Sequence, residues 1–583
     1  MCGIFALIEQ NKININPENA DEIFNKYKST MSNVYSKLHH RGPDQKGNNL
    51  IIDPNFKKTV LMMHTRLKIC GDDTTQPLVN DDNTIYLIIN GEIFNWKELS
   101  EELDFTCTKS DCEIIFPLYQ KYKNDLPTLF NKLNGQFSFF LYDLQEQHIL
   151  IGRDHIGITP LYIGINKKEN RFLISSELKC LTDDLVEEIQ IFPPRNYIYA
   201  NVNIDAHNFT NFYKEYLNLR EKYSLLSQFD TENVIKNRNM ITQNIREKLT
   251  SSVKMQLRDL IFNKEPDFGV LLSGGLDSSL IASLVVSLAD EMGYNKKIKT
   301  FSIGINKDVP DLVAARKVAD FLGTDHHEYY FSIQEGLDNL QNIIYFTETY
   351  DATTIRASTP MYLLTKQIKE NFRDLKVLFS GELSDELLCY LYGANAPTEK
   401  DFQLETINLV SNVHQFDCLR ANKTCMANSI EVRVPFTDPN FVDTILSLHP
   451  RYKSFGNVHY TINEMEKQIL RDSFKGFLPN SILYRKKEQF SDGVSGFNGK
   501  ENNWIDALKD FSNNNYSDLQ FNELKQHYHY NPPSTKEQLH YRISFQKLFN
   551  NIPLCEKTVM YWEPKWTKDK DPSGRVQNFW TKN

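Results

Sequence analysis

The amino-terminal part of the chain alternates between short apolar runs and turn signals. Three of these runs, Thr84–Asn90, Gln136–Asp143 and His148–Arg153, combine aliphatic, β-branched and aromatic residues, and Gly, Asp or Asn residues close them. Runs of this length, bounded by such residues, are typical of β-strands joined by turns. We therefore expect an antiparallel, sheet-rich domain that extends to about residue 200.

The pattern changes after a polar and aromatic segment that has no clear period. We interpret residues 204–240 as a linker between a domain over residues 1–203 and a second domain over residues 241–583. In the second domain apolar strands alternate with helices. The strands are expected at Phe268–Leu272, Lys299–Ile305 and Lys376–Ser380, and the helices at Leu280–Leu288 and Asp311–Leu322. This alternation predicts a parallel sheet that binds ligands at the carboxyl ends of its strands.

The composition of the chain excludes several classes of function. Its 583 residues are 40% hydrophobic and 24% charged, which is typical of a globular protein with more than one core. The net charge of −9 gives no electrostatic footprint for nucleic acid or for an anionic membrane. No apolar stretch approaches the ~20 residues that span a bilayer. We expect small molecules as partners, and the sequence leaves a homodimer open.

The cysteines indicate the compartment. There are nine of them, an odd number, and none forms a CxxC pair, which argues against a disulfide framework and against a zinc ribbon. The opening apolar run Ile4–Ile8 is short and follows no basic residue, which argues against a signal peptide. We therefore expect a reducing, cytoplasmic location.

Cys2 places a thiol beside the start of the chain. If Met1 is removed, this thiol and the new α-amine belong to one residue. An α-amine has a pKa of about 7.7–8.0, so much of it is neutral near pH 7 and can act as the base that activates the thiol. The alternative interpretation is that Cys2 is a small apolar residue at the start of a strand, as free cysteines often are.

Three other fragments could complete a site for an amino acid that carries a side-chain amide. Asn90 and Gly91 follow an apolar strand, where a side-chain amide and a backbone N–H can converge on an oxyanion. Arg66 is suited to bind a carboxylate through two nitrogens, and Asp111 is suited to hold an α-ammonium group. Each fragment alone has a plainer interpretation, because Asn-Gly commonly forms a hairpin turn and a single Arg or Asp is commonly solvated. Together they would present the amide to Cys2.

In their order along the chain these fragments resemble the class II glutamine amidotransferases, whose nucleophile is the amino-terminal residue. The resemblance rests on MCGI, HHRGPD (His39–Asp44), HTRL, NGEIFN (Asn90–Asn95), SDCE and GRDHIGITPLY (Gly152–Tyr162). It implies an N-terminal-nucleophile type of antiparallel β-sandwich flanked by helices, with Cys2 as the nucleophile. It also implies an oxyanion hole at Asn90 and Gly91, and glutamine binding by Arg66, Asn90, Glu92 and Asp111.

The segment Ser273–Ser279 (SGGLDSS) follows the first expected strand of the second domain and precedes a helix. Its two glycines let the backbone approach a phosphate group, and the serine hydroxyls and the helix N-terminus can donate hydrogen bonds to it. The segment is not a Walker A loop, since it lacks the GK[ST] ending. Asp277 would repel a phosphate unless a cation intervened, which makes Mg²⁺ part of the hypothesis.

A second acidic segment, Gly381–Glu386 (GELSDE), follows another expected strand. Asp385 could complete a metal–pyrophosphate site with Asp277, and Glu382 could act as a base toward an incoming amine. An acidic loop is more commonly a solvated turn, but the end of a parallel strand is where ligands bind in such sheets.

Two further segments offer groups to the same chemistry. Arg485–Phe490 (RKKEQF) could place a cation on an α-phosphate as pyrophosphate leaves, although short basic runs are commonly just exposed. Tyr350–Arg356 (YDATTIR) offers hydroxyls and a guanidinium to a second amino acid.

SGGLDSS resembles the pyrophosphate loop of the ATP pyrophosphatases, which cleave ATP between the α and β phosphates. With TFSIGI, DLVAARKVAD, YDATTIRAST, SGELSDE, EVRVPF (Glu431–Phe436) and KEQFSDG (Lys487–Gly493), the chain resembles the asparagine synthetases over nearly its whole length. The resemblance implies a carboxyl-terminal α/β domain with a parallel sheet, of the ATP-pyrophosphatase type. It implies ATP-dependent synthesis of asparagine from aspartate, with glutamine as nitrogen donor and β-aspartyl-AMP as intermediate.

The same resemblance assigns roles by position. Aspartate is expected at Thr354 and Arg356, and Mg²⁺ with pyrophosphate is expected at Asp277 and Asp385. Lys487 is expected to steady the phosphates during catalysis. ATP is expected to contact Leu271, Ser273, Gly274, Gly275, Asp277, Ser278, Ser279, Ile303, Ser380 and Gly381.

Three positions depart from the family pattern. Leu383 stands in the acidic loop where the family usually has glycine, and Ser429 stands at a usual glycine position before EVRVPF. Arg195 replaces a common glycine after Phe192–Pro194. None of the three removes an expected catalytic group, so they bear on loop geometry and efficiency.

Three other functions stay open at this point. A related synthetase could activate a different carboxylate. An amidotransferase paired with phosphoribosyl transfer would share the first domain, but SGGLDSS and SGELSDE do not fit it. A non-enzymatic regulatory descendant would be expected to have lost Cys2, Asp277 or Lys487, and all three are present.

Overall fold

The computed structural model describes residues 1–10, 20–53, 58–71, 74–203, 205–224, 238–262, 266–388, 390–456, 459–486, 490–495 and 503–567. The chain divides into two compact units. The first unit comprises Met1–Leu217, Met426–Ile430 and Phe545–Val559, and the second comprises Asn218–Cys425, Glu431–Ser544 and Met560–Asn583. The boundaries that the sequence predicts at residues 203 and 240 stay a prediction.

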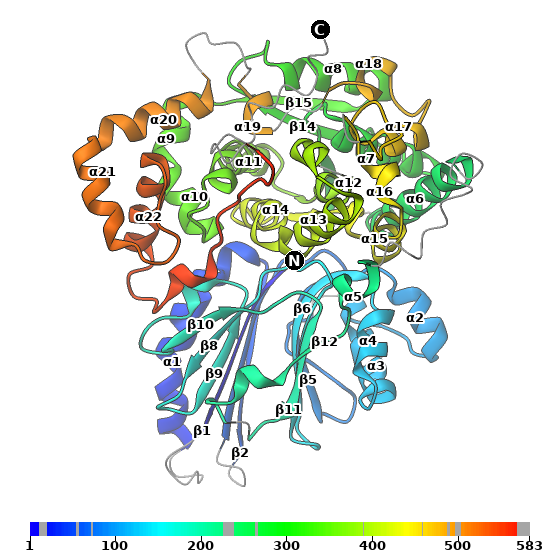
Figure 1. Cartoon of the computed structure of the whole chain (residues 1–583). Helices are drawn as coiled ribbons and strands as arrows, with labels where there is room; N and C mark the ends of the chain where they lie inside the picture. Colours follow the sequence, from blue (N-terminus) through cyan, green and yellow to red (C-terminus); the bar gives the residue numbers. More distant parts are fainter. Residues whose placement is uncertain are drawn as a thin grey trace. The chain divides into compact units, whose positions relative to one another are not determined.

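The first unit contains two antiparallel sheets of six strands each (Figure 1). One sheet has the order β10 (Glu188–Ile191), β8 (Tyr162–Asn166), β9 (Arg171–Ser175), β1 (Gly3–Gln10), β3 (Lys58–Arg66) and β2 (Gln45–Asp53). The other has the order β12 (Tyr213–Glu215), β11 (Asn196–Asn201), β7 (His148–Arg153), β6 (Gly135–Asp143), β5 (Ile85–Ile93) and β4 (Leu78–Val79). The antiparallel architecture that the sequence predicts for this half is confirmed.

The two sheets form a sandwich because each carries alternate apolar residues on its inner face. Ile4 and Ile8 of β1 belong to the same buried cluster as Ile88 of β5 and Phe140 of β6. Successive side chains of a strand point to opposite faces, so the neighbours of these residues point out of the sandwich.

Helices cover the outer face of the second sheet. Leu87, Ile89 and Phe139 pack there with apolar residues of α2 (Trp96–Leu103), α3 (Ile115–Tyr122) and α4 (Leu126–Lys132). Both faces of β5 and β6 are buried, so the sequences of these two strands are almost continuously apolar. This explains the apolar runs in the first half of the sequence. On the first sheet, α1 (Ala20–Leu38) packs against β1 and β3.

Strand β5 is longer than the sequence predicts. It continues past Asn90 to Ile93 and pairs with β6 throughout, so Asn90 and Gly91 lie in a strand and not in a hairpin turn. A Cβ on Gly91 would lie 2.0 Å from the carbonyl oxygen of Gln136 on β6, and the residue has a φ of +150°. Glycine is therefore required where the two strands approach.

The second unit is built on a parallel sheet of five strands (Figure 1). Its order is β15 (Asp325–Tyr330), β14 (Lys299–Gly304), β13 (Asp267–Leu271), β16 (Leu375–Phe379) and β17 (Glu431–Arg433). The chain begins at β13 in the centre, adds β14 and β15 on one side, and then adds β16 and β17 on the other. Such a reversal is a topological switch point, where ligands bind in open parallel sheets. The predicted parallel α/β fold is confirmed.

Most of the remaining helices belong to the second unit. The longer ones are α6 (Arg238–Phe262), α7 (Leu276–Glu291), α8 (Pro310–Leu322), α11 (Ala352–Asn371), α13 (Glu399–Asn412), α14 (Asp417–Met426), α20 (Trp504–Asn515) and α22 (Lys536–Leu548). The shorter ones are α5 (Leu219–Tyr223), α9 (Ile333–Asp338), α10 (Leu340–Thr347), α12 (Ser384–Leu388), α15 (Pro439–Leu446), α16 (Pro450–Lys453), α17 (Gln468–Ser473), α18 (Asn480–Leu483), α19 (Phe490–Gly493) and α21 (Asp518–Leu524). The last residues of α14 and α22 belong to the first unit.

Helix α7 begins earlier than the predicted Leu280. Only residues 272–275 separate it from β13, so Asp277, Ser278 and Ser279 lie in its first turn. The carboxylate and hydroxyls of the SGGLDSS segment are thus carried by a helix N-terminus, which favours anions.

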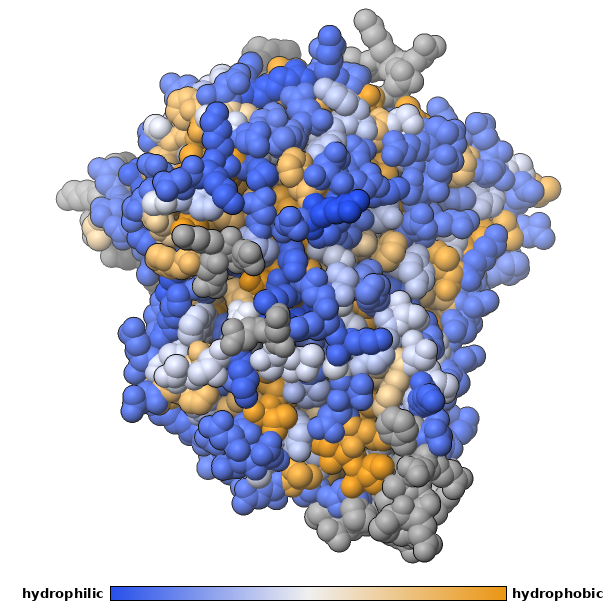
Figure 2. Space-filling view, turned by 180° about the vertical axis from the view of Figure 1, so that it is seen from behind, coloured by the Kyte–Doolittle hydropathy of each residue, from blue (hydrophilic) through white to orange (hydrophobic). Residues whose placement is uncertain are grey.

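Hydrophilic residues predominate on the face drawn in Figure 2, and apolar residues form smaller groups among them. In the part of the chain that the structure describes, no helix is long and apolar enough to cross a bilayer.

Candidate active sites

Cys2 is fixed in the first unit by contacts on both of its backbone polar groups. Its N–H donates to Asn90 Oδ1 at 2.8 Å, and its carbonyl oxygen accepts from Arg41 Nε at 2.8 Å. Its Sγ lies 4.0 Å from the carbonyl oxygen of Leu67. The nucleophile expected from the sequence is therefore buried directly beside the strand that carries the expected oxyanion hole.

Glu92 and Arg66, two of the charged residues expected to bind glutamine, also shift the pKa of the Cys2 thiol. Burial raises the pKa of the Cys2 thiol, and the negative charge of Glu92 raises it further. The positive charges of the chain's terminal amine and of Arg66, with the Leu67 contact, oppose this rise in pKa. A thiol with a raised pKa needs a nearby base before it can attack, as the sequence hypothesis for the α-amine supposes.

Arg66 and Asp111 are both held by backbone groups. Arg66 Nη2 donates to the carbonyl oxygen of Cys70 at 2.8 Å. Asp111 Oδ2 accepts from the N–H of Ile93 at 2.8 Å, and Oδ1 accepts from Ser110 Oγ at 2.9 Å. Asp111 is thereby attached to the end of β5, two residues beyond Gly91. The predicted roles of these residues in binding glutamine stay predictions.

Two residues beside Cys2 were not singled out from the sequence. Ser176 Oγ accepts from the N–H of Ile4 at 3.1 Å and lies 3.4 Å from Asn90 Nδ2, so it orients the amide of Asn90. Arg41 belongs to the HHRGPD motif, and its Nη1 donates to Glu177 at 2.7 Å. Arg41 could have been found from its motif, whereas Ser176 offers no signal in the sequence.

A pocket in the second unit lies at the carboxyl ends of β13 and β16, where the strand order reverses. It collects most of the residues that the sequence assigns to ATP, aspartate and Mg²⁺. Those that line it are Leu271, Ser273, Gly275, Asp277, Ser278, Ile303, Thr354, Ser380, Gly381, Glu382 and Asp385. Gly274, Ser279 and Arg356 are not among its lining residues in the described part of the chain.

The loop between β13 and α7 explains why Gly274 lies outside the lining. Its φ is +73°, and a Cβ there would lie 2.4 Å from the backbone nitrogen of Ala315 on α8. Gly274 therefore lets the loop pack on α8, while Ser273 and Ser278 face the pocket with their hydroxyl oxygens 3.1 Å apart. Ser279 is fully buried in the first turn of α7.

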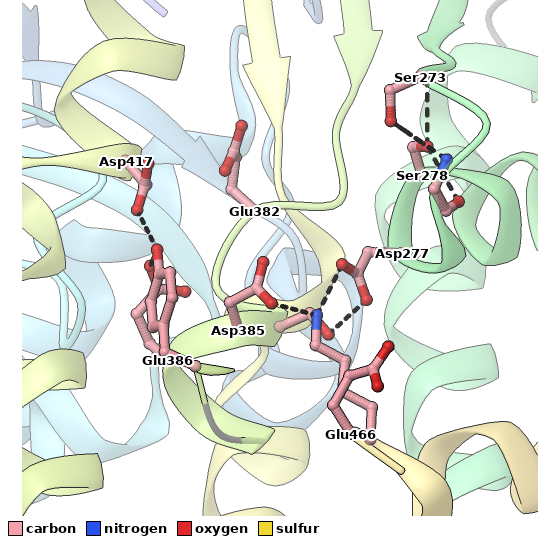
Figure 3. A network of polar contacts seen from close by, with 12 residues as sticks. Ser273, Asp277, Ser278, Glu382, Asp385, Glu386, Asp417 and Glu466 are labelled. Atoms are coloured by element: carbon pink, nitrogen blue, oxygen red, sulfur yellow. Dashed lines mark hydrogen bonds and ion pairs between the residues drawn. The ribbon is translucent and has the colours of Figure 1, made fainter. Parts of the chain in front are cut away.

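The two aspartates expected near Mg²⁺ converge on one lysine (Figure 3). Lys467 Nζ lies 2.7 Å from Asp277 Oδ2 and 2.7 Å from Asp385 Oδ1. Ser384 Oγ donates to the other oxygen of Asp277 at 2.8 Å. Sequence reasoning missed Lys467, which is buried, lines the pocket and has a φ of +54°. Lys467 belongs to none of the motifs recognised in the sequence, so nothing there indicated its role.

Of the two residues expected to bind aspartate, Thr354 lines the pocket and Arg356 does not, and their role in binding aspartate stays a prediction. The hydroxyl and N–H of Thr354 both donate to Asp351 Oδ2 at 2.8 Å. Arg356 is held by Glu537 through Nε at 2.8 Å and Nη2 at 2.6 Å, so its charge is already matched inside the protein. The hydroxyl of Thr353, by contrast, lines the pocket and has no hydrogen-bond partner among the described residues.

Comparison with known proteins covers both units. Residues 1–215 match the family model of the glutamine amidotransferase domain, and residues 244–402 and 392–567 match that of asparagine synthase. A probable glutamine-hydrolysing asparagine synthetase from Dictyostelium discoideum is 39% identical over 99% of this chain and 99% of its own. Asparagine synthetase 1 from Saccharomyces cerevisiae is 38% identical over 100% of both chains, and asparagine synthetase B from Escherichia coli is 36% identical over 92% of this chain and 94% of its own.

The chain belongs to the glutamine-hydrolysing asparagine synthetases. The family that the sequence motifs indicate is thus confirmed, and the match extends through both halves of the chain.

The acidic groups of this asparagine synthetase fit a hard cation. Asp277 and Asp385 approach a single positive charge with one oxygen each, and oxygen donors are those that Mg²⁺ prefers. Two protein carboxylates leave room for water and for phosphate oxygens, which is the usual arrangement for Mg²⁺ bound with a nucleotide. Mg²⁺ itself stays a prediction.

A second group of acids, Glu386 and Asp417, also lines the pocket (Figure 3). Burial raises the pKa of Glu386 well above its usual value, and the adjacent charge of Asp417 raises it further. Although burial pushes the pKa of Asp417 upward as well, the positive charge of Arg420 holds it below its usual value. The pKa values of these two neighbouring carboxyl groups are therefore shifted in opposite directions.

The basic segment of the synthetase is described in part. Lys487, the expected catalytic lysine, lies outside the described residues. Arg485 and Lys486 line the pocket, and Arg485 Nη2 lies 3.0 Å from Asp311 Oδ1. Asp311, which the sequence predicts only as the start of a helix, also lines the pocket.

All three departures from the family's glycines have positive φ angles, which are +75° at Leu383, +55° at Ser429 and +61° at Arg195. Glycine adopts a positive φ without steric cost, which explains why the family usually has glycine at these three positions. Leu383 is buried and is not among the residues that line the pocket in the described chain, so its side chain does not narrow it.

Proposed function

We propose that this chain makes L-asparagine from L-aspartate, with ATP as the energy source and glutamine as the nitrogen donor. The observation that carries the proposal is that one chain holds both a buried Cys2 beside Asn90 and a pocket with Asp277 and Asp385 at a switch point. Full-length similarity to asparagine synthetases supports it.

In the first unit, the α-amine of Cys2 takes the thiol proton after removal of Met1, and the thiolate attacks the side-chain amide of glutamine. The amide of Asn90 and the N–H of Gly91 donate hydrogen bonds to the oxyanion that forms. Ammonia leaves with the proton, and water hydrolyses the remaining glutamyl thioester to glutamate. Arg66, Glu92 and Asp111 hold the α-carboxylate and α-ammonium groups of glutamine.

In the second unit, the β-carboxylate of aspartate attacks the α-phosphorus of ATP, and the bond to pyrophosphate breaks. Ser273, Ser278 and the N-terminus of α7 donate hydrogen bonds to the pyrophosphate. Lys487 adds a positive charge there, and bound Mg²⁺, held by Asp277 and Asp385, would neutralise the phosphate charge. The product of this step is β-aspartyl-AMP.

Ammonia then attacks the acyl carbon of β-aspartyl-AMP. AMP leaves with the electrons of the broken C–O bond, and Glu382 takes a proton from the nitrogen, so asparagine is released neutral at its amide. Ammonium ion cannot attack, so the ammonia has to reach this site before it is protonated in water.

The deciding experiment supplies aspartate, ATP, Mg²⁺ and glutamine labelled with ¹⁵N in its amide. We expect labelled asparagine, AMP and pyrophosphate in equal amounts, measured by mass spectrometry and phosphate analysis. Formation of glutamate without AMP would support the glutaminase activity but overturn aspartate as the acceptor. The chain would then be expected to be a synthetase for a different carboxylate.

We also propose that the enzyme works in the cytoplasm. All eight described cysteines are free thiols, which suits a reducing compartment. Fractionation of cells that express the tagged chain would test this location. A homodimer stays a prediction, and light scattering of the purified chain would decide it.

A further inference from the structure

Arg420 links two carboxylates inside the synthetase pocket. Its Nη2 donates to Glu382 Oε2 at 2.9 Å, and its Nη1 donates to Asp417 Oδ1. All three residues line the pocket, and the side chain of Arg420 is only 8% exposed. A guanidinium is planar, so a nitrogen fixed on one carboxylate also fixes the direction of the other nitrogens.

Asp417 is the fixed end of this link. The hydroxyl of Tyr390 donates to Asp417 Oδ2 at 2.7 Å and lies 3.1 Å from Glu386 Oε1. Arg420 Nη1 contacts the other oxygen of Asp417, so both carboxylate oxygens of Asp417 accept hydrogen bonds. Asp417 is therefore a fixed and buried acceptor that holds one arm of Arg420.

Glu382 is the more exposed end of the link. It lies in the turn between β16 and α12, and its side chain is 21% exposed to the pocket. A long acidic side chain on a turn has several rotamers, and only some of them reach a reacting atom. The Nη2 of Arg420 selects one of these positions.

We propose that Arg420 is the positioning residue of the amination step. It holds the carboxylate of Glu382 at one place in the pocket, where this carboxylate can accept a proton. This inference rests on the proposed function of the pocket, because it assigns Glu382 as the base of that reaction.

In the amination step, the lone pair of ammonia forms a bond to the acyl carbon of β-aspartyl-AMP, and the nitrogen becomes positively charged. The C–O bond to AMP breaks and its electrons leave with AMP. One proton passes from the nitrogen to the Glu382 carboxylate. Adenylation of aspartate involves no such proton, so it does not need Arg420 to orient Glu382.

The test separates the two half-reactions in the full-length chain. Arg420→Gln is compared with wild type in asparagine formation from free ammonia, and in aspartate-dependent exchange of labelled pyrophosphate into ATP. We expect amination to fall by about 100-fold, because a misplaced base loses most of its effect, while exchange changes by less than about threefold. Arg420→Lys keeps the positive charge but loses the planar guanidinium that contacts two carboxylates at once, and we expect a smaller loss of amination.

A double-mutant cycle distinguishes positioning from a structural role. Once Glu382→Gln has removed the base, Arg420→Gln should cause little further loss of amination, because the two changes remove one interaction. Arg316→Gln is the matched control, since Arg316 also forms a forked ion pair, with Glu328, but does not line the pocket. If Arg420→Gln does not fold, Arg420→Lys is used in the same cycle.

The outcomes are distinct. Equal loss of amination and exchange in Arg420→Gln, or losses that multiply in the double variant, would overturn the role of Arg420. A wild-type chain that shows neither exchange nor asparagine formation would overturn the proposed function itself. Loss of amination alone, absent in the Arg316→Gln control, supports the inference.

Discussion

Leu383, Ser429 and Arg195 hold backbone conformations that cost an L-residue about 1–2 kcal/mol relative to glycine. Their side chains provide contacts that glycine would lack. Leu383 buries an isobutyl group, and Ser429 Oγ donates to the carbonyl oxygen of His40 at 2.7 Å. Arg195 Nη1 donates to the carbonyl oxygen of His155 at 2.8 Å. At each position backbone strain and side-chain contact oppose one another.

Whether substitution by glycine is tolerated depends on the free energy of the side-chain contact that is lost. Leu383→Gly relieves the strain but removes a buried leucine, which is worth about 2–5 kcal/mol, so we expect a clear fall in the melting temperature. Ser429→Gly loses one hydrogen bond of about 0.5–1.5 kcal/mol and relieves a similar strain, so its melting temperature should be close to that of wild type. Thermal unfolding followed by circular dichroism measures both. A Leu383→Gly variant as stable as wild type would show that the leucine contributes no net packing.

The raised pKa of Glu386 makes the stability of the folded chain depend on pH. Its pKa is raised in the folded chain, so folded protein binds a proton that unfolded protein releases above a pKa of about 4.3. Stability contributed by this group therefore falls as pH rises from about 4.3 toward the raised folded-state pKa.

Glu386→Gln removes this dependence while keeping an N–H donor toward Asp417. We expect the melting temperature of the variant to fall less than that of wild type as the pH rises above about 4.3. Parallel pH dependence of the two proteins, measured by differential scanning fluorimetry, would contradict a raised pKa at Glu386.

At the scale of elements, the loop from β13 to α7 contains two glycines that differ in backbone conformation and in their neighbours. Gly274 has a φ of +73° and contacts α8, whereas Gly275 has a φ of −71° as the N-cap of α7. A Cβ on Gly275 would meet its nearest neighbour, Ser273 Oγ, at 3.4 Å, which is an ordinary contact. The folded chain therefore requires glycine at only one of the two positions.

Alanine at each position provides a matched pair. We expect Gly274→Ala to lower the melting temperature strongly, because the left-handed conformation costs about 1–2 kcal/mol and the Cβ would clash with backbone. Gly275→Ala should leave it nearly unchanged. Similar melting temperatures for both variants would mean that α8 moves away from the loop without cost.

The sequence predicted the elements whose residues are buried on both faces. Strands β13, β14 and β16 are short apolar runs bounded by polar loops, and they lie within a residue or two of their expected bounds. The bounds of β5 and α7 were less well predicted, because Asn90-Gly91 and SGGLDSS contain turn-forming residues that tertiary contacts hold in a strand and in a helix. Local propensity is overridden in both cases.

Contacts between distant residues could not be predicted. Arg356 pairs with Glu537, 181 residues away, and Lys467 pairs with Asp277, 190 residues away. Single motifs indicate which residues are chemically suited to a site, but the partner that already occupies a charge depends on the assembled fold. This is why Arg356 was expected to be free for a ligand and Lys467 was missed.

At the scale of the whole molecule, the two sets of reactive groups belong to separate units. We expect Cys2→Ala to abolish glutamine hydrolysis and glutamine-dependent synthesis, while synthesis from free ammonia stays within about twofold of wild type. The two rates are measured on one preparation, with ammonia saturating in the second assay. Loss of the ammonia-dependent rate in Cys2→Ala would contradict separate sites.

The first unit is completed by residues near the other end of the chain. The N–H of Asp183 donates to the carbonyl oxygen of Asn551 at 2.8 Å, and the 3₁₀ helix Cys555–Thr558 packs on β10. A ribosome finishes the sheets of this unit long before it makes the segment that covers their edge. An expression fragment that stops at residue 217 would therefore carry an uncovered edge strand, and an independently folding glutaminase needs a replacement for Phe545–Val559.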